Sequence, residues 1–148
     1  MSPKNSVIAA TTTSGTLSTS FANGSVIDGV TLVTGQRILI KNQVTSTENG
    51  IYTVNASGSP TRTTDFAIGG SVAGAYTFVE QGTVNSNSGY ICTSVSGSDV
   101  VGTNNVIFTL FSGAGEFSAG TGLTKTGTTF SVNASQTQIT SVGTLGTL

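Results

Sequence analysis

Two short apolar runs on either side of a polar loop do most to constrain the fold of this 148-residue chain. The first run, RILIK at residues 37–41, carries a charge at each end, and the second, NGIYTV at residues 49–54, begins with an Asn-Gly turn signal. Residues of this kind favour strands, and turn residues mark where a strand begins. The pattern therefore predicts two strands around a polar loop, at residues 36–41 and 51–55.

A weak internal repeat predicts a second hairpin of the same kind. Four residues of the first segment recur 38 positions later, and each set lies between two β-rich runs. We therefore expect two similar hairpins with polar tips at residues 44–49 and 84–88, although a composition this biased can also produce four matches by chance. The matching pairs are Gln43 and Gln81, Thr45 and Thr83, Asn49 and Asn87, and Tyr52 and Tyr90.

Composition extends this prediction to the whole chain. Val, Ile and Thr make up about a third of the residues, and their β-branched side chains suit a pleated sheet better than a helix. No window has the apolar spacing of an amphipathic helix over three turns. We predict an all-β fold, with a compact antiparallel β-sandwich or flattened barrel over residues 7–113 and an N-terminal arm at residues 1–6. The other expected strands cover residues 7–10, 16–21, 29–33, 75–80, 90–94 and 106–111.

Residues 114–148 differ from the preceding part in composition and in period. They open with a glycine-rich joint, after which GLTKTG and TTFSV can pair as a small hairpin. Four apolar residues near the end recur at every third position, a period that fits neither a flat strand nor a helix. Such a period suits a chain that winds with two partners around a shared axis, so we predict the start of an intertwined homotrimeric stalk. Its apolar contacts would be Ile139, Val142, Leu145 and Leu148.

The charge and cysteine content exclude several classes of function. Only 7% of the residues are charged and the net charge is −1, which gives no electrostatic basis for binding nucleic acid or an anionic membrane. No run is long and apolar enough for membrane insertion. Histidine is absent and Cys92 is the only cysteine, so an intrachain disulfide and a Cys/His zinc site are excluded. We expect Cys92 to be a small buried apolar residue.

The acidic residues give little support for catalysis. A Ser-His-Asp triad requires histidine, and glycoside hydrolysis requires two carboxylates that flank one bond. Each acid instead lies in or beside a predicted turn or strand end, where a polar turn or surface role accounts for it. We therefore expect no enzyme activity, no cofactor and no metal. The acids are Asp28, Glu48, Asp65, Glu80, Asp99 and Glu116.

Five motifs in the middle of the chain resemble a repeat domain of phage tail-fibre proteins. They are IDGV at residues 27–30, G-x-R at 35–37, KNQ at 41–43, NGIY at 49–52 and TR-x-x-D at 61–65. In that family the same series is followed by a strand like YTFVEQGT, which stands here at residues 76–83.

The resemblance covers nearly the whole chain. It extends upstream to residues 7–24 and downstream to VIFTLFSGAG at 106–115, and a second fibre-like signature follows in GTGLTKTGTTFSV at 120–132. It implies a virion protein: a structural spacer or knob in a homotrimeric fibre, bound to other virion proteins of the tail, baseplate or capsid. A tail fibre is our first interpretation, and a capsid (head) fibre fits the same sequence.

A receptor-binding module for host cell-surface glycans is the alternative from a different class. The two polar tips would then make the contact, because polar hairpin ends are common places for recognition. The absence of Trp and the position of Tyr52, Tyr76 and Tyr90 in predicted strands count against exposed sugar-stacking rings. The candidate contacts are Thr45, Ser46, Thr47, Glu48, Asn49, Asn85, Ser86, Asn87 and Ser88.

Two further sets of residues carry specific predictions. Arg37, Arg62 and Asp65 could contact a sugar, or an Arg–Asp pair could attach the TRTTDF loop to a strand with bidentate geometry, which we favour. Tyr52 and Tyr90 follow the two tips at matching positions. We expect both rings to be mostly buried, with the hydroxyl near solvent or a backbone partner.

Overall fold

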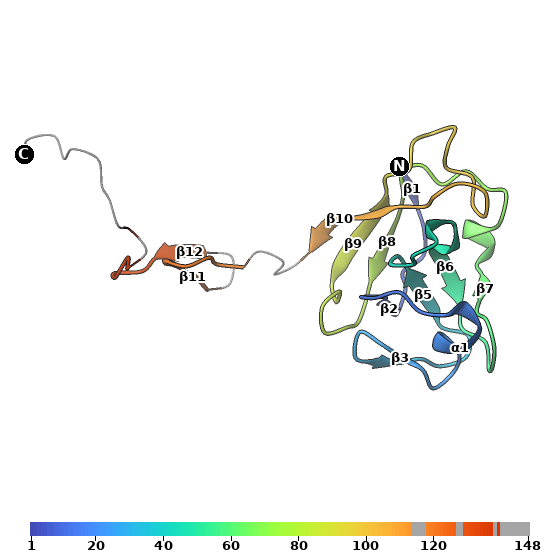
Figure 1. Cartoon of the computed structure of the whole chain (residues 1–148), viewed down its shortest axis with the longest axis horizontal. Helices are drawn as coiled ribbons and strands as arrows, with labels where there is room; N and C mark the ends of the chain where they lie inside the picture. Colours follow the sequence, from blue (N-terminus) through green and yellow to red (C-terminus); the bar gives the residue numbers. More distant parts are fainter. Residues whose placement is uncertain (114–117, 127–128, 138, 140–148) are drawn as a thin grey trace, which may run out of the picture. The chain divides into compact units, whose positions relative to one another are not determined.

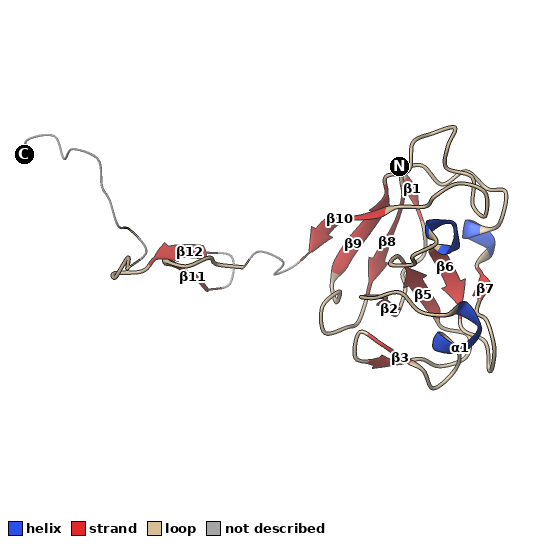
Figure 2. Ribbon diagram, in the orientation of Figure 1, coloured by secondary structure: helices blue, strands red, loops and turns tan. Residues whose placement is uncertain are grey.

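The computed structural model describes residues 1–113, 118–126, 129–137 and 139. The chain divides into two compact units, Met1–Gly113 and Ala114–Leu148 (Figure 1). Strands are the main regular structure of the described residues, which confirms the all-β prediction (Figure 2).

The first sheet of unit 1 has four strands in the order β1-β8-β9-β10. These are β1 (Ser2–Pro3), β8 (Ala75–Val79), β9 (Ser88–Cys92) and β10 (Phe108–Gly113). The β8–β9 and β9–β10 pairs are antiparallel, as a hairpin series requires, whereas β1 pairs with β8 in parallel. The β8–β9 hairpin lies where the internal repeat predicts it.

The second sheet of unit 1 has the order β2-β5-β6-β7. Its strands are β2 (Ala9–Ala10), β5 (Arg37–Ile40), β6 (Gly50–Thr53) and β7 (Thr61–Arg62). The runs RILIK and NGIYTV form β5 and β6, an antiparallel hairpin with Ile38 opposite Tyr52, as the sequence predicts. The β2–β5 pair is parallel, so the antiparallel prediction holds for the hairpins and fails for the N-terminal strands.

The N-terminal segment joins the two sheets. The main-chain N–H of Val7 donates to the carbonyl of Phe78, at 2.9 Å, and the N–H of Ile8 donates to the carbonyl of Arg37, at 2.8 Å. Residues 1–6, which we expected as a separate arm, include β1 and pair with the first sheet. Parallel pairing is invisible to local sequence patterns because its partners lie far apart in the chain.

The main core lies between the two sheets. Leu39 and Ile51 from the second sheet belong to the same buried cluster as Val79 and Tyr90 from the first. The two sheets therefore pack face to face, as in a β-sandwich. The buried members of this cluster are Val7, Ala10, Leu39, Ile51, Phe66, Val72, Ala75, Val79, Tyr90, Cys92, Val101 and Val106.

A second buried cluster covers the other face of the β5–β6 hairpin. Ile38, Ile40 and Tyr52 pack there with Phe21 and with a β-ribbon. The ribbon is formed by β3 (Val26–Ile27) and β4 (Val30–Thr31), which contribute Ile27 and partly buried Val30. Because β5 is buried on both faces, its three apolar side chains alternate between two cores, which explains the continuous apolar run.

The expected strand at residues 16–21 is wrong: the segment contains the short helix α1 (Leu17–Ser20). Leu17 and Phe21 both pack into the second cluster. A single helical turn brings residues four apart to within about 6 Å along the axis on one side, whereas a strand would separate them by about 13 Å. Tertiary packing thus decides this segment, and two 3₁₀ turns, η1 (Ser46–Glu48) and η2 (Thr64–Phe66), complete unit 1.

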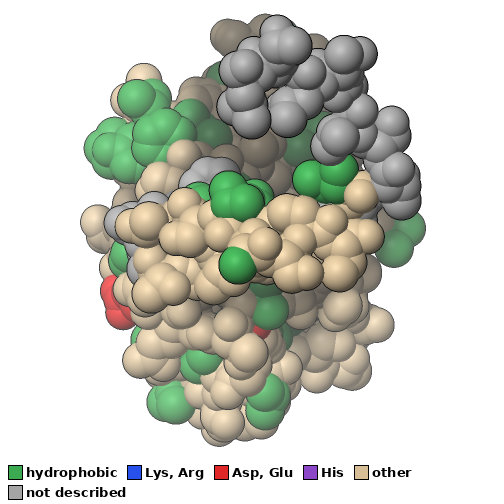
Figure 3. Space-filling view, turned by 90° about the vertical axis from the view of Figure 1, so that its left-hand side faces the viewer, with side chains coloured by type: hydrophobic (Ala, Val, Ile, Leu, Met, Phe, Trp, Pro, Cys, Tyr) green, Lys and Arg blue, Asp and Glu red, His purple; other side chains and the backbone are tan. Residues whose placement is uncertain are grey.

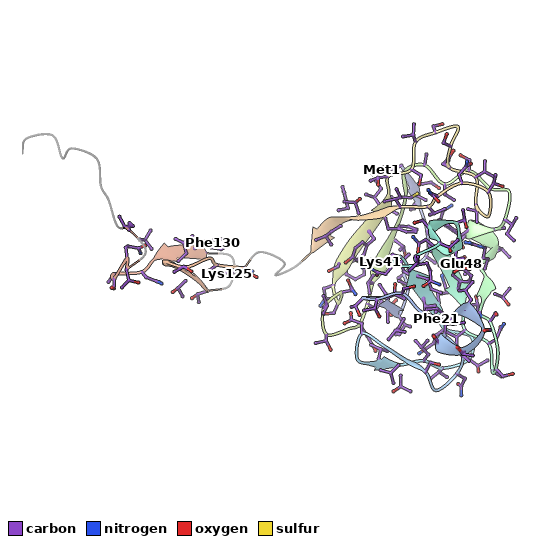
Figure 4. All side chains as sticks on the ribbon, viewed as in Figure 1. Met1, Phe21, Lys41, Glu48, Lys125 and Phe130 are labelled. Atoms are coloured by element: carbon purple, nitrogen blue, oxygen red, sulfur yellow. The ribbon has the colours of Figure 1, made fainter. Side chains whose placement is uncertain are left out.

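The described part of unit 2 contains the predicted small hairpin, formed by β11 (Leu123–Thr126) and β12 (Thr129–Val132), with Leu123 opposite Val132. Figure 4 labels Lys125 and Phe130 on its two strands. Of the four predicted stalk contacts, Ile139 is described and is 52% exposed. Val142, Leu145 and Leu148 lie outside the described residues. No helix of the described residues is long and apolar enough to cross a membrane.

Candidate functional site

The first predicted tip, residues 44–49, is fastened to the core at its end. Asn49 is only 3% exposed, and its side-chain carbonyl accepts the main-chain N–H of Gln43 at 2.9 Å. Its amide nitrogen donates to the carbonyl of Val106, also at 2.9 Å. The N–H of Val106 in turn donates to the carbonyl of Ser46 in η1, at 3.1 Å. The tip therefore holds a distant loop, so it is not the free polar hairpin end that the receptor-binding interpretation requires.

Arg62 holds the same tip from the other side. Its two terminal nitrogens donate to the main-chain carbonyls of Asn49, at 3.0 Å, and Thr47, at 2.7 Å. Its guanidinium lies over the Tyr52 ring, with Cζ 4.7 Å from the ring centroid, and the Tyr52 hydroxyl donates to the carbonyl of Glu48. Burial raises the pKa of Tyr52 and lowers that of Arg62. Arg62 thus has a structural role, as we favoured.

A surface groove of about 680 Å³ opens beside this tip. Thr47, Glu48 and Arg62 supply polar groups to it, and the Gln43 side chain donates to the Glu48 carboxylate at 3.0 Å. Ligand sites commonly have volumes of about 300–1,000 Å³ and a mainly apolar wall with a few polar groups. The apolar part of this wall consists of Leu17, Pro60, Ala67 and Ile68.

The second predicted tip, residues 84–88, is also attached to the core. The Asp28 carboxylate accepts the main-chain N–H groups of Val84, at 2.9 Å, and Asn85, at 2.8 Å. Asn85 is 2% exposed, donates its amide to the carbonyl of Ala10 at 3.2 Å, and accepts the hydroxyl of Tyr90. This tip, too, has core contacts that we did not expect.

The nine candidate contact residues differ in exposure. Only two of them, Thr45 and Asn87, are exposed, and Asn87 has φ 56°, a left-handed conformation that Asn tolerates better than most residues. The half-buried ones are Ser46, Thr47, Glu48 and Ser86, and the buried ones are Asn49, Asn85 and Ser88. The structure places Thr47 and Glu48 in the groove wall and none of the candidates from the second tip there.

The stems of the two hairpins meet. Lys41, which precedes the first tip, lies with Nζ 4.8 Å from the ring centroid of Tyr90, which follows the second. Tyr52 and Tyr90 are 3% and 8% exposed, which confirms that both matched rings are buried. Each has a cation over its ring and a hydroxyl bonded to its own tip. Two other matched pairs differ in environment, because Gln43 and Asn49 are buried whereas Gln81 and Asn87 are exposed. Figure 4 labels Lys41 and Glu48 in this unit.

The acidic side chains near strand ends fix loops. Arg37 makes the predicted bidentate pair with Asp65, with nitrogen–oxygen distances of 3.2 and 2.9 Å. Burial opposes the charge on Asp65, but hydrogen bonds from Arg37 and Thr63 outweigh it and lower the pKa of this carboxyl. Hydrogen bonds from the Ser71 hydroxyl and from the main-chain N–H groups of Ala73, Gly97 and Val72 lower the pKa of Asp99 to about 2.

The described residues contain no group of three or more Cys, Asp or Glu side chains that could hold a metal ion. Cys92 is buried, 2% exposed, as we predicted. Comparison of the chain with family models, curated proteins and solved structures finds no match.

Proposed function

We propose that this protein is a structural spacer or knob module of a homotrimeric virion fibre, namely a phage tail fibre. The observation that carries the proposal is the exposed β11–β12 hairpin. Its apolar side chains Leu123, Phe130 and Val132 are 41%, 45% and 74% exposed. A lone two-stranded hairpin is at best marginally stable in water, and further strands or a packed surface are needed. Additional copies of the chain would supply both.

Three copies are favoured by the sequence that follows the hairpin. Apolar residues recur at every third position from Ile139 onward. If three chains wound around a shared axis, this period would place an apolar residue of each chain toward the axis at regular intervals. Threefold association would also cover the open strand edges of the hairpin, which otherwise present unpaired backbone groups.

Unit 1 suits a spacer or knob because its polar groups maintain its own fold. Asp28, Asp65 and Asp99 bind loops, and Arg37 and Arg62 are engaged in internal contacts. Figure 3, which views the whole chain from the left-hand side of Figure 1, shows few charged side chains among the described residues on that side. A surface with so little charge is hydrated mainly through its hydroxyl groups. It does not attract charged partners electrostatically.

The groove beside the first tip favours one second function, recognition of a host cell-surface glycan. A sugar ring has an apolar face and a rim of hydroxyl groups. The groove wall offers the apolar side chains of Leu17 and Ile68 to the face and the Glu48 carboxylate to the hydroxyl groups. Glu48→Gln and Ile68→Ser would test this on intact particles. Loss of attachment in both, with the exposed Val95→Ser unchanged, would favour receptor binding, and unaltered attachment would leave the spacer role alone.

Antibody labelling of intact particles in electron micrographs tests the proposed location. Gold-labelled antibodies raised against unit 1 should mark fibres at the tail. Labelling of capsid-borne fibres would replace the tail fibre with a capsid fibre, and particles without any label would contradict a virion role.

A further inference from the structure

One face of the first sheet carries apolar side chains that unit 1 leaves uncovered. Tyr76 and Phe78 on β8 alternate with the buried residues Ala75, Thr77 and Val79, so they point away from the core. Phe78 is 46% exposed, and Phe111 on β10 is 57% exposed.

The exposed side chains form one continuous patch. Tyr76 pairs with Ile91 across β8 and β9, so the two share this face. Beyond the register shift in β10, the ring of Phe111 lies 6.4 Å from that of Tyr76, centroid to centroid. We call Tyr76, Phe78, Ile91 and Phe111 the outer aromatic face.

The second sheet provides the contrast. Its own outward side chains, Ile38, Ile40 and Tyr52, are covered by Phe21 and the β3–β4 ribbon, and all are nearly fully buried. Unit 1 therefore has a covering layer for one sheet and none for the other. A contiguous apolar patch left exposed on a soluble protein commonly marks an interaction surface.

The chemistry of the face points to a copy of the same chain. The four strands of this sheet contain no Lys, Arg, Asp or Glu, so the face offers nothing to select a charged partner. Strand β10 is at the edge of the sheet, and the chain continues from it into unit 2, the part proposed to trimerise. Copies joined through unit 2 hold their outer aromatic faces at high local concentration, so even a weak contact between faces would form.

We infer that the outer aromatic faces of three copies pack against one another around the threefold axis. This inference rests on the proposed trimer and adds a second contact to it, within unit 1. It assigns Phe78 and Phe111 to an interface between copies and makes unit 1 part of the rigid fibre shaft.

A tryptophan probe tests the inference in the full chain, which has no Trp of its own. Phe111→Trp places the probe on the outer aromatic face, and Val44→Trp places a control at a tip residue that is 90% exposed. Sedimentation equilibrium gives the oligomeric state of each variant, and acrylamide quenching gives the access to the indole. We expect a trimer in which F111W is quenched several-fold less than V44W and emits at a shorter wavelength.

The outcomes separate this inference from the proposed function. A trimer in which F111W and V44W are quenched equally overturns the inference and leaves the trimer intact. A monomeric wild-type chain overturns both, and protection of the F111W indole in such a monomer would assign the face to the chain's own residues. If the wild-type chain is a trimer and the F111W variant is a monomer that keeps the circular dichroism of its strands, the result would support the inference.

A charge on the same face provides an independent measurement. Phe78→Asp should shift the trimer toward monomer at a given concentration, whereas Val95→Asp, at a loop position that is 74% exposed, should not. Circular dichroism confirms that both variants keep their strands. Equal trimer stability in the two variants would overturn the inference.

Discussion

The side-chain amide of Asn49 donates a hydrogen bond to the main-chain carbonyl of Val106, across 57 positions of the chain. The same side chain accepts the N–H of Gln43, so one buried amide joins the base of a hairpin to a distant loop. What looks in the sequence like a polar tip is therefore part of the framework of unit 1.

Asn49→Ala should lower the free energy of unfolding by about 1–3 kcal/mol, because it leaves two buried backbone groups without a partner. Urea denaturation followed by circular dichroism measures the change. Thr45→Ala, at an exposed position of the same tip, should have almost no effect. Equal midpoints for the two variants would mean that the Asn49 hydrogen bonds add nothing.

Tyr52→Ala should destabilise unit 1 by about 3 kcal/mol, the low end for removal of a buried aromatic ring. Tyr52→Phe keeps the ring and loses only the hydrogen bond to Glu48, so about 1 kcal/mol is expected. The denaturation midpoints should fall in that order. An unchanged midpoint for Tyr52→Ala would mean an exposed ring, which would then be a candidate platform for a sugar.

The carboxyl of Asp99 should make stability depend on pH. Its pKa is about 2 in the folded chain, against roughly 3.9 for an unfolded aspartate. A depressed pKa stabilises the fold above the unfolded value, and this contribution disappears as the pH falls from about 4 to about 2. The stability difference between wild type and Asp99→Asn should therefore narrow across that window, as measured by urea titrations at several pH values. A constant difference would contradict the assignment.

Metal chelation should leave the thermal unfolding midpoint unchanged, because the described residues contain no group of three or more acids that could hold a metal ion. Purified protein should likewise release no reducing ends from host polysaccharide. A chelator-dependent fall in the midpoint would reveal a metal site. Polysaccharide cleavage that is lost on mutation of one acid would identify an enzyme.

Local patterns in the sequence predict the hairpins well. RILIK and NGIYTV form β5 and β6, and the matched positions of Tyr52 and Tyr90 correctly indicate two buried rings. Turn residues and β-branched runs act over a few residues, so they can be recognised without tertiary information. Helix α1 and the parallel pairs of β1 and β2 depend on contacts that a local pattern does not contain.

The groove and the outer aromatic face also depend on contacts between residues far apart in the chain, which local patterns do not predict. Leu17 reaches the groove from helix α1 and Ile68 from a distant turn, so no spacing in the sequence connects them. For the outer face a signal was present: AYTFV at residues 75–79 is apolar at Tyr76 and Phe78 as well as at Ala75 and Val79. A strand in which apolar residues do not alternate with polar ones is typically buried on both faces, either within its own chain or against another chain.

Sedimentation equilibrium of the full chain is the most direct test of the proposed fibre assembly, because it measures mass without regard to shape. We expect one species with three times the 14.8 kDa mass of the chain, at micromolar concentration and near-neutral pH. Truncation after Gly113 should weaken or abolish that association by removing the exposed hairpin and the residues beyond it. A single species with the mass of one full-length chain would contradict the account.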